Sequence, residues 1–401
     1  MKIDVLKLKH IPLTVKLLGL VSFFNDLSSE MIYPIVPIFL TSVLHTPVPI
    51  VGLIEGIAEA TASITKFLFG AYSDYIQKRK PFVVGGYSLA AFSKLLIGLA
   101  YAWPFVLFAR FVDRLGKGMR TAARDSLLLD NATSMNKGFI FGFHRAFDSL
   151  GAVIGPLLAL LFLTLLKENI RLTFLIAFIP AFVAVCLLVF FVQETKKPQT
   201  EKKLFFKDFR WRQVDTRLQV FLFISFLFSV GNSSDAFLLL YAKNIGFTTT
   251  LVVLVYVLYN ISQTLFATPL GNLSDRIGAK KVFSLGLVVF AIVYFLFGLT
   301  HTARFLWFLF PIYGIYIAAT DGVSKAYISE FIKKEASGTY FGAYYTLTAV
   351  GTFLASLIGG ILWSSINPSA TFFYGSSMAI LAFIAFSLSE IAFTKKGKST
   401  H

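Results

Sequence analysis

Several ionisable side chains lie inside long apolar stretches of the sequence, at spacings that would allow proton exchange. Asp26 and Glu30 are four residues apart, so in a helix they share one face. Arg114 follows Asp113 in another apolar stretch. A charged group at the bilayer centre costs about 2.5–3.5 kcal/mol, so it must face a protein interior, form a pair or line water. An acid beside an arginine can bind and release a proton, and we expect Asp26, Glu30 and Asp113 to carry protons opposite Arg114.

Permanent ion pairing is the alternative role for these charges. Asp113 and Lys117 are four residues apart, and Arg145 and Asp148 are three apart, so each pair could close on one helix. Further polar residues of the apolar stretches are candidates to line a substrate cavity: Asn25, Tyr33, Glu59, Arg110, Lys117, Arg145, Asp148, Asp235 and Asp321. The basic members could bind a carboxylate, a phosphate or a chelate. Because most of these charges lie in the first half of the chain, we expect that half to contain the coupling machinery.

The elements that would hold these residues are membrane-spanning helices. The chain has 401 residues, of which 56% are hydrophobic and 14% charged, whereas soluble domains carry roughly a quarter charged residues. A bilayer core is crossed by about 20 helical residues. Stretches of that length lie at 12–42, 48–72, 81–101, 103–124, 138–166 and 171–193, and at 217–243, 249–272, 281–300, 304–329, 338–366 and 369–393. The sequence predicts an all-α membrane protein with 12 transmembrane helices.

The basic residues that give the net charge of +16 lie mainly in the connectors between these stretches. Lys and Arg concentrate in alternate connectors and in the polar segment at 194–216, and the remaining connectors carry almost none. This bias predicts that the N- and C-termini are cytoplasmic, and it explains the basic charge without nucleic acid as a partner. The N-terminal segment lacks a small-x-small cleavage site, so we interpret it as part of an uncleaved first helix.

The two halves of the sequence repeat each other. GAYSDYIQKRK at 70–80 matches GNLSDRIGAKK at 271–281, and the segment at 138–151 matches that at 338–351, both at an offset near 200. SSE at 28–30 matches SSD at 233–235. The repeat predicts two pseudo-symmetric six-helix bundles, 1–193 and 217–401, joined by a cytoplasmic linker at 194–216. Duplicated bundles around a site at the bilayer midplane are typical of secondary transporters.

Three motifs resemble the major facilitator superfamily. The loop at 271–281 resembles its cytoplasmic signature G-x-x-x-D-[RK]-x-G-x-[RK]-[RK], and the loop at 70–80 departs from that pattern at Tyr75 and Gln77. The resemblance implies a gating motif made of Gly70, Asp74, Arg79 and Lys80, then Gly271, Asp275, Arg276, Gly278, Lys280 and Lys281. Arg114, Gly118 and Ala122 are similar to the family pattern R-x-x-x-G-x-x-x-A, whose arginine is linked to proton transfer in proton-coupled members. The resemblance implies the major facilitator fold.

A third resemblance lies in the fifth predicted helix. Gly151, Gly155 and Pro156 resemble the start of the bend motif G-x-x-x-G-P-x-x-G-G of exporters, although Ala159 and Leu160 replace its last two glycines. Small residues four apart also form ordinary close-packed helix contacts, so both interpretations remain open.

These features favour a proton-coupled transporter that moves a small organic solute across the cell inner membrane by alternating access, with efflux preferred. Uptake of an anionic solute or chelate is the alternative, and a non-transporting membrane sensor or assembly protein is the alternative from another class. The sequence contains no nucleophile–base set, metal-ligand spacing or G-x-x-x-x-G-K-[ST] phosphate loop, so we expect no enzyme activity, no metal and no cofactor. The family resemblance implies a monomer in the lipid bilayer.

Overall fold

The computed structural model describes residues 11–76, 78–131, 137–194, 214–331 and 337–398, and all regular secondary structure in these ranges is helical. In the first half the helices are α2 (Leu13–Ile32), α3 (Val36–Ile38), the π-helix η1 (Phe39–Val43), α4 (Val48–Ile76), α5 (Lys80–Leu99), α6 (Trp103–Asp130), α7 (Lys137–Leu165) and α8 (Ile170–Phe191). In the second half they are α9 (Thr216–Gly231), α10 (Ala236–Asn244), α11 (Thr249–Ile277), α12 (Ala279–Leu299), α13 (Ala303–Ser329), α14 (Ser337–Ser365) and α15 (Pro368–Lys398). The all-α prediction is confirmed.

The chain divides into two compact units. Unit 1 contains Met1–Val36 and Ile64–Leu204, and unit 2 contains Pro37–Ser63 and Phe205–His401. The boundary passes through α4, whose first residues belong to unit 2 and whose last residues belong to unit 1. The division into bundles at 1–193 and 217–401 stays a prediction.

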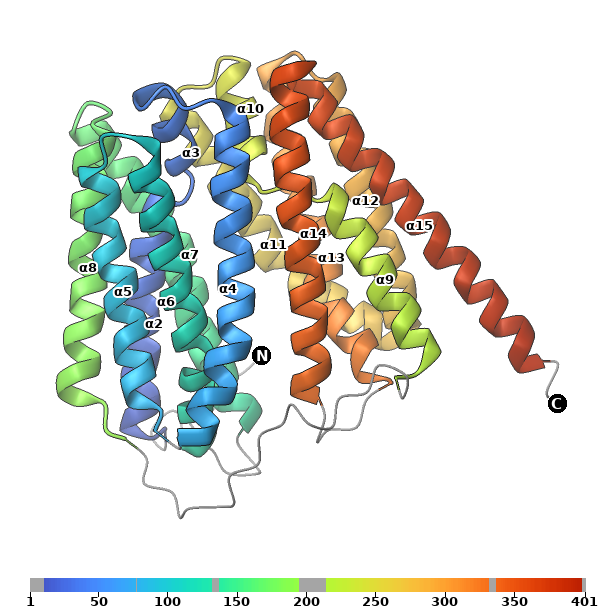
Figure 1. Ribbon diagram of the computed structural model, residues 1–401, viewed down its shortest axis with the longest axis horizontal. Coiled ribbons are helices and arrows are strands. Elements are labelled where there is room, and N and C mark those ends of the chain that lie inside the picture. The colour runs from blue at the N-terminus through green and yellow to red at the C-terminus, as the bar shows by residue number, and fades with distance from the viewer. Residues whose placement is uncertain (1–10, 77, 132–136, 195–213, 332–336, 399–401) are drawn as a thin grey trace. The chain divides into compact units, whose positions relative to one another are not determined.

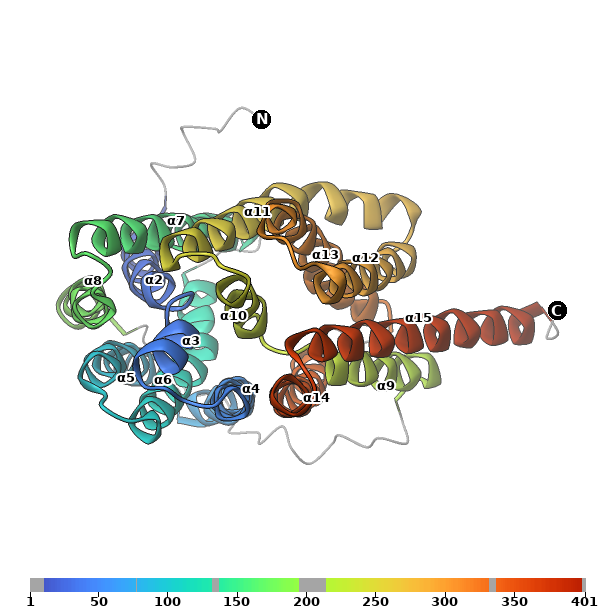
Figure 2. The same ribbon diagram turned by 90° about the horizontal axis from the view of Figure 1, so that it is seen from above.

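The same four helix pairings occur in both units. In unit 1, α2 packs against α7 and α8, and α5 packs against α6 and α8 (Figures 1 and 2). In unit 2, α9 packs against α14 and α15, and α12 packs against α13 and α15. Each helix in the second set stands at the position in the chain that the sequence repeat assigns to its counterpart. The repeat therefore extends from the sequence to the way the helices pack.

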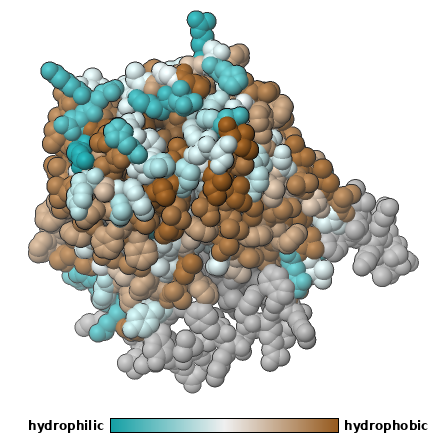
Figure 3. Space-filling view, turned by 45° about the horizontal axis from the view of Figure 1, so that its top comes forward, coloured by the Kyte–Doolittle hydropathy of each residue, from teal (hydrophilic) through white to brown (hydrophobic). Residues whose placement is uncertain are grey.

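Ten helices are long and apolar enough to cross a membrane within the residues described. They are α4, α5, α7, α8, α9 together with α10, α11, α12, α13, α14 and α15. Large apolar side chains remain exposed on them, such as Phe190 at 77% and Phe308 at 69%, as expected for surfaces that contact acyl chains. Apolar side chains also cover much of the face shown in Figure 3. The two other predicted spans fall on α2 and α6, which carry more charged residues, so the count of 12 stays a prediction.

Two stretches expected to be single helices are interrupted. The predicted helix at 12–42 breaks at residues 33–35, next to Pro34. The predicted helix at 217–243 breaks at residues 232–235, between α9 and α10. Proline removes a backbone donor, and the Asn-Ser-Ser-Asp run offers side-chain oxygens that compete with helical hydrogen bonds. The two breaks lie in the first helix of each half, close to the matching SSE and SSD sequences.

Candidate functional site

The polar interior of unit 1 is built largely on α6. Asp113 and Arg114 are 8% and 6% exposed, and Arg110, one turn earlier, is 3% exposed. Phe108 and Phe111 on the same helix are exposed, so the side of α6 that carries the charges faces the protein. Lys117 is exposed on the same helix. α6 therefore brings three of the predicted charged residues into the interior and leaves the fourth at its surface.

Asp113 forms an ion pair with a lysine on the neighbouring helix α5. The Nζ atom of Lys94 lies 2.6 Å from Oδ1 of Asp113, and the side chain of Lys94 is fully buried. Ser93 donates a hydrogen bond to the same oxygen at 3.2 Å. Nε of Arg114 is 3.9 Å from Oδ2. Lys94, not Lys117, is thus the partner of Asp113, and the expected pair at i, i+4 does not form.

The aromatic ring of Tyr33 lies at the end of α2, where it meets the two arginines of α6. The guanidinium carbon of Arg110 is 5.8 Å from the ring centroid, and that of Arg114 is 6.0 Å from it. These distances are within the range of cation–π attraction. The structure therefore brings together three predicted site residues at the point where the first helix breaks.

A second polar group surrounds Asp26 on α2. Nδ2 of Asn25 donates a hydrogen bond to Oδ1 of Asp26 at 3.0 Å, and Asn25 is 1% exposed. The charges of Asp148, Arg120 and Arg124 all act on the Asp26 carboxylate. Two acids and two guanidiniums from three helices thus share one neighbourhood.

Both arginines of this group lie on α6, which runs to Asp130, beyond the expected end at residue 124. The guanidinium carbon of Arg120 lies 4.6 Å from the centroid of the Tyr87 ring, and Arg120 is 6% exposed. Nη1 of Arg124 donates to Oγ of Ser22 on α2 at 3.1 Å. The helix thus carries both arginines into contact with α5 and α2.

Asp148 on α7 contacts a histidine of its own helix. Nδ1 of His144 is 3.6 Å from Oδ2 of Asp148, four residues away. The alternative partner, Arg145, has a side chain that lies outside the described residues. No group of three or more His, Cys, Asp or Glu side chains in the described ranges is arranged to bind a metal ion.

Glycines of α7 bring the acidic face of α2 close to this helix. A Cβ atom at Gly151 would lie 2.7 Å from the carbonyl oxygen of Phe23 and 3.1 Å from Cβ of Asp26. A Cβ atom at Gly155 would lie 2.6 Å from the carbonyl oxygen of Leu27 and 2.9 Å from Cβ of Glu30. The two glycines thus allow close helix packing beside both acids. α7 continues through Pro156 to Leu165.

In unit 2 the predicted residue Asp235 lies at the break between α9 and α10. Tyr313 of α13 donates a hydrogen bond to Oδ1 at 2.7 Å, and Tyr259 of α11 donates to Oδ2 at 3.0 Å. Both tyrosines are buried, whereas Asp235 is partly exposed. The sequence identified the acid, but the two tyrosines were not expected.

The other predicted acids of the second half and of α4 have different settings. Asp321 is exposed on α13 and pairs with Lys325 at 3.0 Å, one turn along the helix. Glu59 is partly exposed on the part of α4 that belongs to unit 2, and Glu55, one turn before it, is 2% exposed. Asp321 is therefore not part of a buried cluster.

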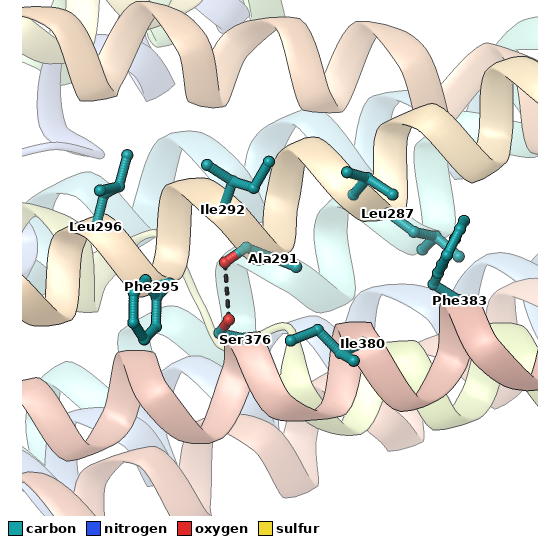
Figure 4. A pocket seen from close by; sticks show the side chains of 9 residues that line it. Leu287, Ala291, Ile292, Phe295, Leu296, Ser376, Ile380 and Phe383 are labelled. Carbon is teal, nitrogen blue, oxygen red and sulfur yellow. Dashed lines mark hydrogen bonds between the residues drawn. The ribbon is translucent and has the colours of Figure 1, made fainter.

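An apolar pocket lies between α12 and α15, with a volume of about 360 Å³ (Figure 4). The residues that line it are Leu287, Val288, Ala291, Ile292, Phe295, Leu296, Ser376, Ile380 and Phe383. Its polar side chain, Ser376, donates a hydrogen bond to the carbonyl oxygen of Ala291 at 2.7 Å. With that hydroxyl occupied, the lining suits a hydrocarbon better than a polar solute.

Comparison with known proteins identifies the family. A model of the Major Facilitator Superfamily matches residues 18–258 and, in a second match, residues 221–400. An MFS-type transporter of Methanocaldococcus jannaschii, MJ1317, is 38% identical over 375 residues, which are 92% of this chain and 92% of that protein. The chain belongs to the major facilitator superfamily. It is a secondary transporter and not an enzyme.

More distant relatives include proteins of drug resistance. Multidrug resistance protein 2 of Bacillus subtilis is 23% identical over 354 residues, 85% of this chain and 86% of its own. The quinolone resistance protein NorA of Staphylococcus aureus is 24% identical over 144 residues, 36% of this chain and 37% of its own. Among solved structures, the nucleoside transporter NupG superposes with a TM-score of 0.75 at 13% identity, covering 94% of this chain and 99% of that one. A POT family transporter gives 0.77 at 14% identity and covers 96% of both chains. These two structures share the fold of this chain.

The first copy of the superfamily loop motif contacts the end of α8. Glu194 accepts hydrogen bonds from the backbone N–H of Arg79 at 3.0 and 3.1 Å and from that of Lys80 at 2.8 Å. Nζ of Lys80 donates to the carbonyl oxygen of Val189 at 3.0 Å, and Nη1 of Arg79 donates to Oγ of Ser73 at 3.0 Å. Glu194 thus caps the N-terminus of α5, a role that was missed because it joins residues more than 100 positions apart.

The second copy of the motif forms the turn between α11 and α12. Gly278 has φ +95°, a left-handed conformation that other residues rarely adopt, and its N–H donates to the carbonyl oxygen of Ser274 at 2.9 Å. Arg276 and Lys281 are exposed, and Lys280 is partly exposed. In the first copy a Cβ atom at Gly70 would lie 3.0 Å from Cβ of Ala122, whereas one at Gly271 would meet nothing within 4 Å. The side chains of Asp74 and Asp275 lie outside the described residues.

Proposed function

We propose that this major facilitator protein is a proton-coupled secondary transporter that exports a small organic solute across the cell inner membrane by alternating access. The observation that carries the proposal is the environment of Asp26, whose carboxylate interacts electrostatically with Asp148, Arg120 and Arg124. Acids kept at membrane depth are typical of proton relays.

This group of four charges offers a way to couple protons to a conformational change. A proton taken up by Asp26 removes one negative charge from this neighbourhood. Arg120 and Arg124 then interact more strongly with Asp148, although Arg124 also keeps its ion pair with Asp125 at 3.0 Å. Loss of the proton reverses this preference. Glu30, one turn further along the same face of α2, is the second proposed proton carrier. Asp113 and Arg114 complete the proposed coupling set, although the ion pair with Lys94 favours a structural role for Asp113.

Export is supported by two observations. Two of the relatives are described as resistance proteins, one for multiple drugs and one for quinolones. Gly151, Gly155 and Pro156 also occupy the start of the exporter bend motif. The proposed topology has 12 spans, cytoplasmic termini and bundles at 1–193 and 217–401, and the proposed functional form is a monomer.

Uptake of an anionic organic solute is the second candidate. Arg110 and Arg114 approach the face of Tyr33 from α6, and both are buried. Guanidinium groups bind carboxylates and phosphates through paired hydrogen bonds. A solute of this kind would use the positive side of unit 1.

Transport by purified protein in proteoliposomes with an imposed pH gradient tests the proposal. We expect a solute whose flux collapses when the gradient is removed. The Asp26→Asn variant should lose gradient-driven flux but keep exchange of solute across the membrane, because exchange needs no net proton movement. Glu330→Gln, which changes an exposed acid at the C-terminal end of α13, is the matched control and should keep both. Equal flux with and without the gradient would refute proton coupling.

A further inference from the structure

The carboxyl group of Asp235 has no basic partner in the described part of unit 2. Its two carboxylate oxygens accept hydrogen bonds from Tyr313 and Tyr259, and no Lys, Arg or His side chain in the described ranges lies within ion-pair distance of it. The charges of Glu59 and Glu55 on α4 add to the negative potential at this carboxylate. A charged group at membrane depth is costly unless an opposite charge accompanies it, so a cation from outside the chain would stabilise this site.

Aromatic rings surround the same carboxylate. The ring centroid of Tyr313 is 5.2 Å from that of Tyr316 and 5.5 Å from that of Tyr259, and Tyr256 lies 5.3 Å from Tyr259. These tyrosines are between 1% and 7% exposed. Aromatic faces attract organic cations, and their apolar area binds the hydrocarbon groups that such cations carry. An acid and several tyrosines together therefore favour a cation with apolar substituents.

Two buried hydroxyl groups beside Asp235 point to a ligand independently. Ser233 is 5% exposed and Tyr294 fully buried, and neither hydroxyl has a hydrogen-bond partner within normal distance among the described residues. The two hydroxyls lie near each other, and the charge of Asp235 acts on Tyr294. Buried polar groups are normally hydrogen-bonded, so exceptions in one cluster indicate a place where another molecule completes the contacts.

The break in the helix makes this cluster reachable. Asp235 is partly exposed although the tyrosines around it are buried. Interrupted helices in corresponding positions of two repeats mark solute sites in secondary transporters. The chain has such interruptions at 33–35 and at 232–235, and the second one carries the acid.

We propose that Asp235 and the surrounding tyrosines bind an amphiphilic organic cation, such as an amine or quaternary ammonium with apolar substituents. The proposal deepens the proposed transport function and rests on it for the movement of the bound cation. Asp235 supplies the opposite charge, and the faces of Tyr259, Tyr313 and Tyr316 contact the apolar groups.

Equilibrium binding of tetraphenylphosphonium to the purified full-length protein tests this site. Tetraphenylborate is the matched control, because it has the same shape and the opposite charge. We expect the protein to bind the phosphonium and to bind the borate at least about tenfold more weakly, a difference of about 1.4 kcal/mol. Equal affinity for the two ions would overturn the proposal without any variant.

Variants then assign the charge to one residue. Asp235→Asn should weaken phosphonium binding by about tenfold or more, whereas Asp235→Glu should keep affinity within a few fold. Glu330→Gln, which changes an exposed acid at the C-terminal end of α13 in the same unit, should leave binding unchanged. Undiminished binding by a folded Asp235→Asn protein would refute the assignment, and if that variant fails to fold, the comparison of the two probe ions still decides.

Flux in proteoliposomes separates failure of this site from failure of the transport proposal. Asp235-dependent phosphonium binding without gradient-driven flux would support the cation site and refute proton coupling. Gradient-driven flux of another solute, with phosphonium binding insensitive to Asp235, would refute the cation site and leave proton coupling intact.

Discussion

The buried ion pair between Lys94 and Asp113 makes a strong prediction about stability. Its atoms are 2.6 Å apart, Lys94 is fully buried, and Asp113 is 8% exposed. Replacing Lys94 by Met leaves an acid that still contacts Ser93 and Arg114, and replacing Asp113 by Leu leaves an ammonium group that has lost its acceptor. Both replacements approximately preserve side-chain volume. The two single variants therefore differ mainly in the charge that they leave without a partner.

Removal of one partner of a buried ion pair costs about 3–5 kcal/mol, because the other charge is left buried and uncompensated. We expect Lys94→Met at the lower end of this range, because two contacts remain for Asp113, and Asp113→Leu at the upper end. For a unit of 150–250 residues each kcal/mol shifts the melting temperature by about 2–4 °C, so the loss is about 6–20 °C. The double variant removes both charges and should be more stable than either single variant.

A double-mutant cycle tests this prediction. It compares the thermal unfolding of the unchanged protein, Lys94→Met, Asp113→Leu and the double variant in one detergent. Lys325→Met is the matched control, because it breaks an exposed ion pair on α13, the counterpart of α6 in unit 2, and should cost less than about 1 kcal/mol. Losses that add up in the double variant would refute the reasoning, because the two charges would then act independently. Single losses no larger than that of the control would show that water reaches the pair.

Three further predictions follow from backbone contacts. Glu194→Ala removes the cap of α5 and should lower the free energy of unfolding by about 0.5–2 kcal/mol, measured as a fall in melting temperature, with Glu194→Gln losing less. Gly155→Ala places a methyl group 2.6 Å from the backbone of Leu27 and should cost about 1–3 kcal/mol, whereas Gly271→Ala, with nothing within 4 Å, should cost nothing measurable on the same melting curves. Gly278→Ala forces a side chain into a left-handed conformation and should cost about 1–2 kcal/mol by thermal unfolding, and an unchanged melting temperature would show that the turn relaxes.

Local spacing made several features of the site predictable. The four-residue spacing of Asp26 and Glu30 placed both acids on one face of a helix. The four-residue spacing of Gly151 and Gly155 left a close helix contact and an exporter bend motif as the two interpretations. The structure brings these two patterns together on α2 and α7. Either pattern is visible in the sequence, but the pairing of the two helices depends on the fold.

Contacts between distant residues could not be predicted in this way. Asp113 had a basic residue within one turn, yet it pairs with Lys94, which lies 19 positions earlier on α5. Burial decides the choice, because both members of the real pair face the interior whereas Lys117 remains exposed. The capping role of Glu194 could not be predicted either, because Arg79 and Lys80 lie more than 100 positions earlier in the sequence. Both helix breaks had a local signal in the sequence, Pro34 in the first half and the run of Asn, Ser, Ser and Asp at 232–235 in the second.

The charge of α6 has a consequence for how the protein is made. In the proposed topology of 12 spans this helix must enter the bilayer with Arg110, Asp113, Arg114 and Arg120, each of which costs about 2.5–3.5 kcal/mol in isolation. α5 precedes it directly and carries Lys94, the partner of Asp113. Biosynthetic insertion of α5 and α6 as one hairpin would neutralise part of that cost before the later helices emerge from the ribosome. A break of this ion pair would therefore reduce the yield of inserted protein as well as the stability of the finished fold.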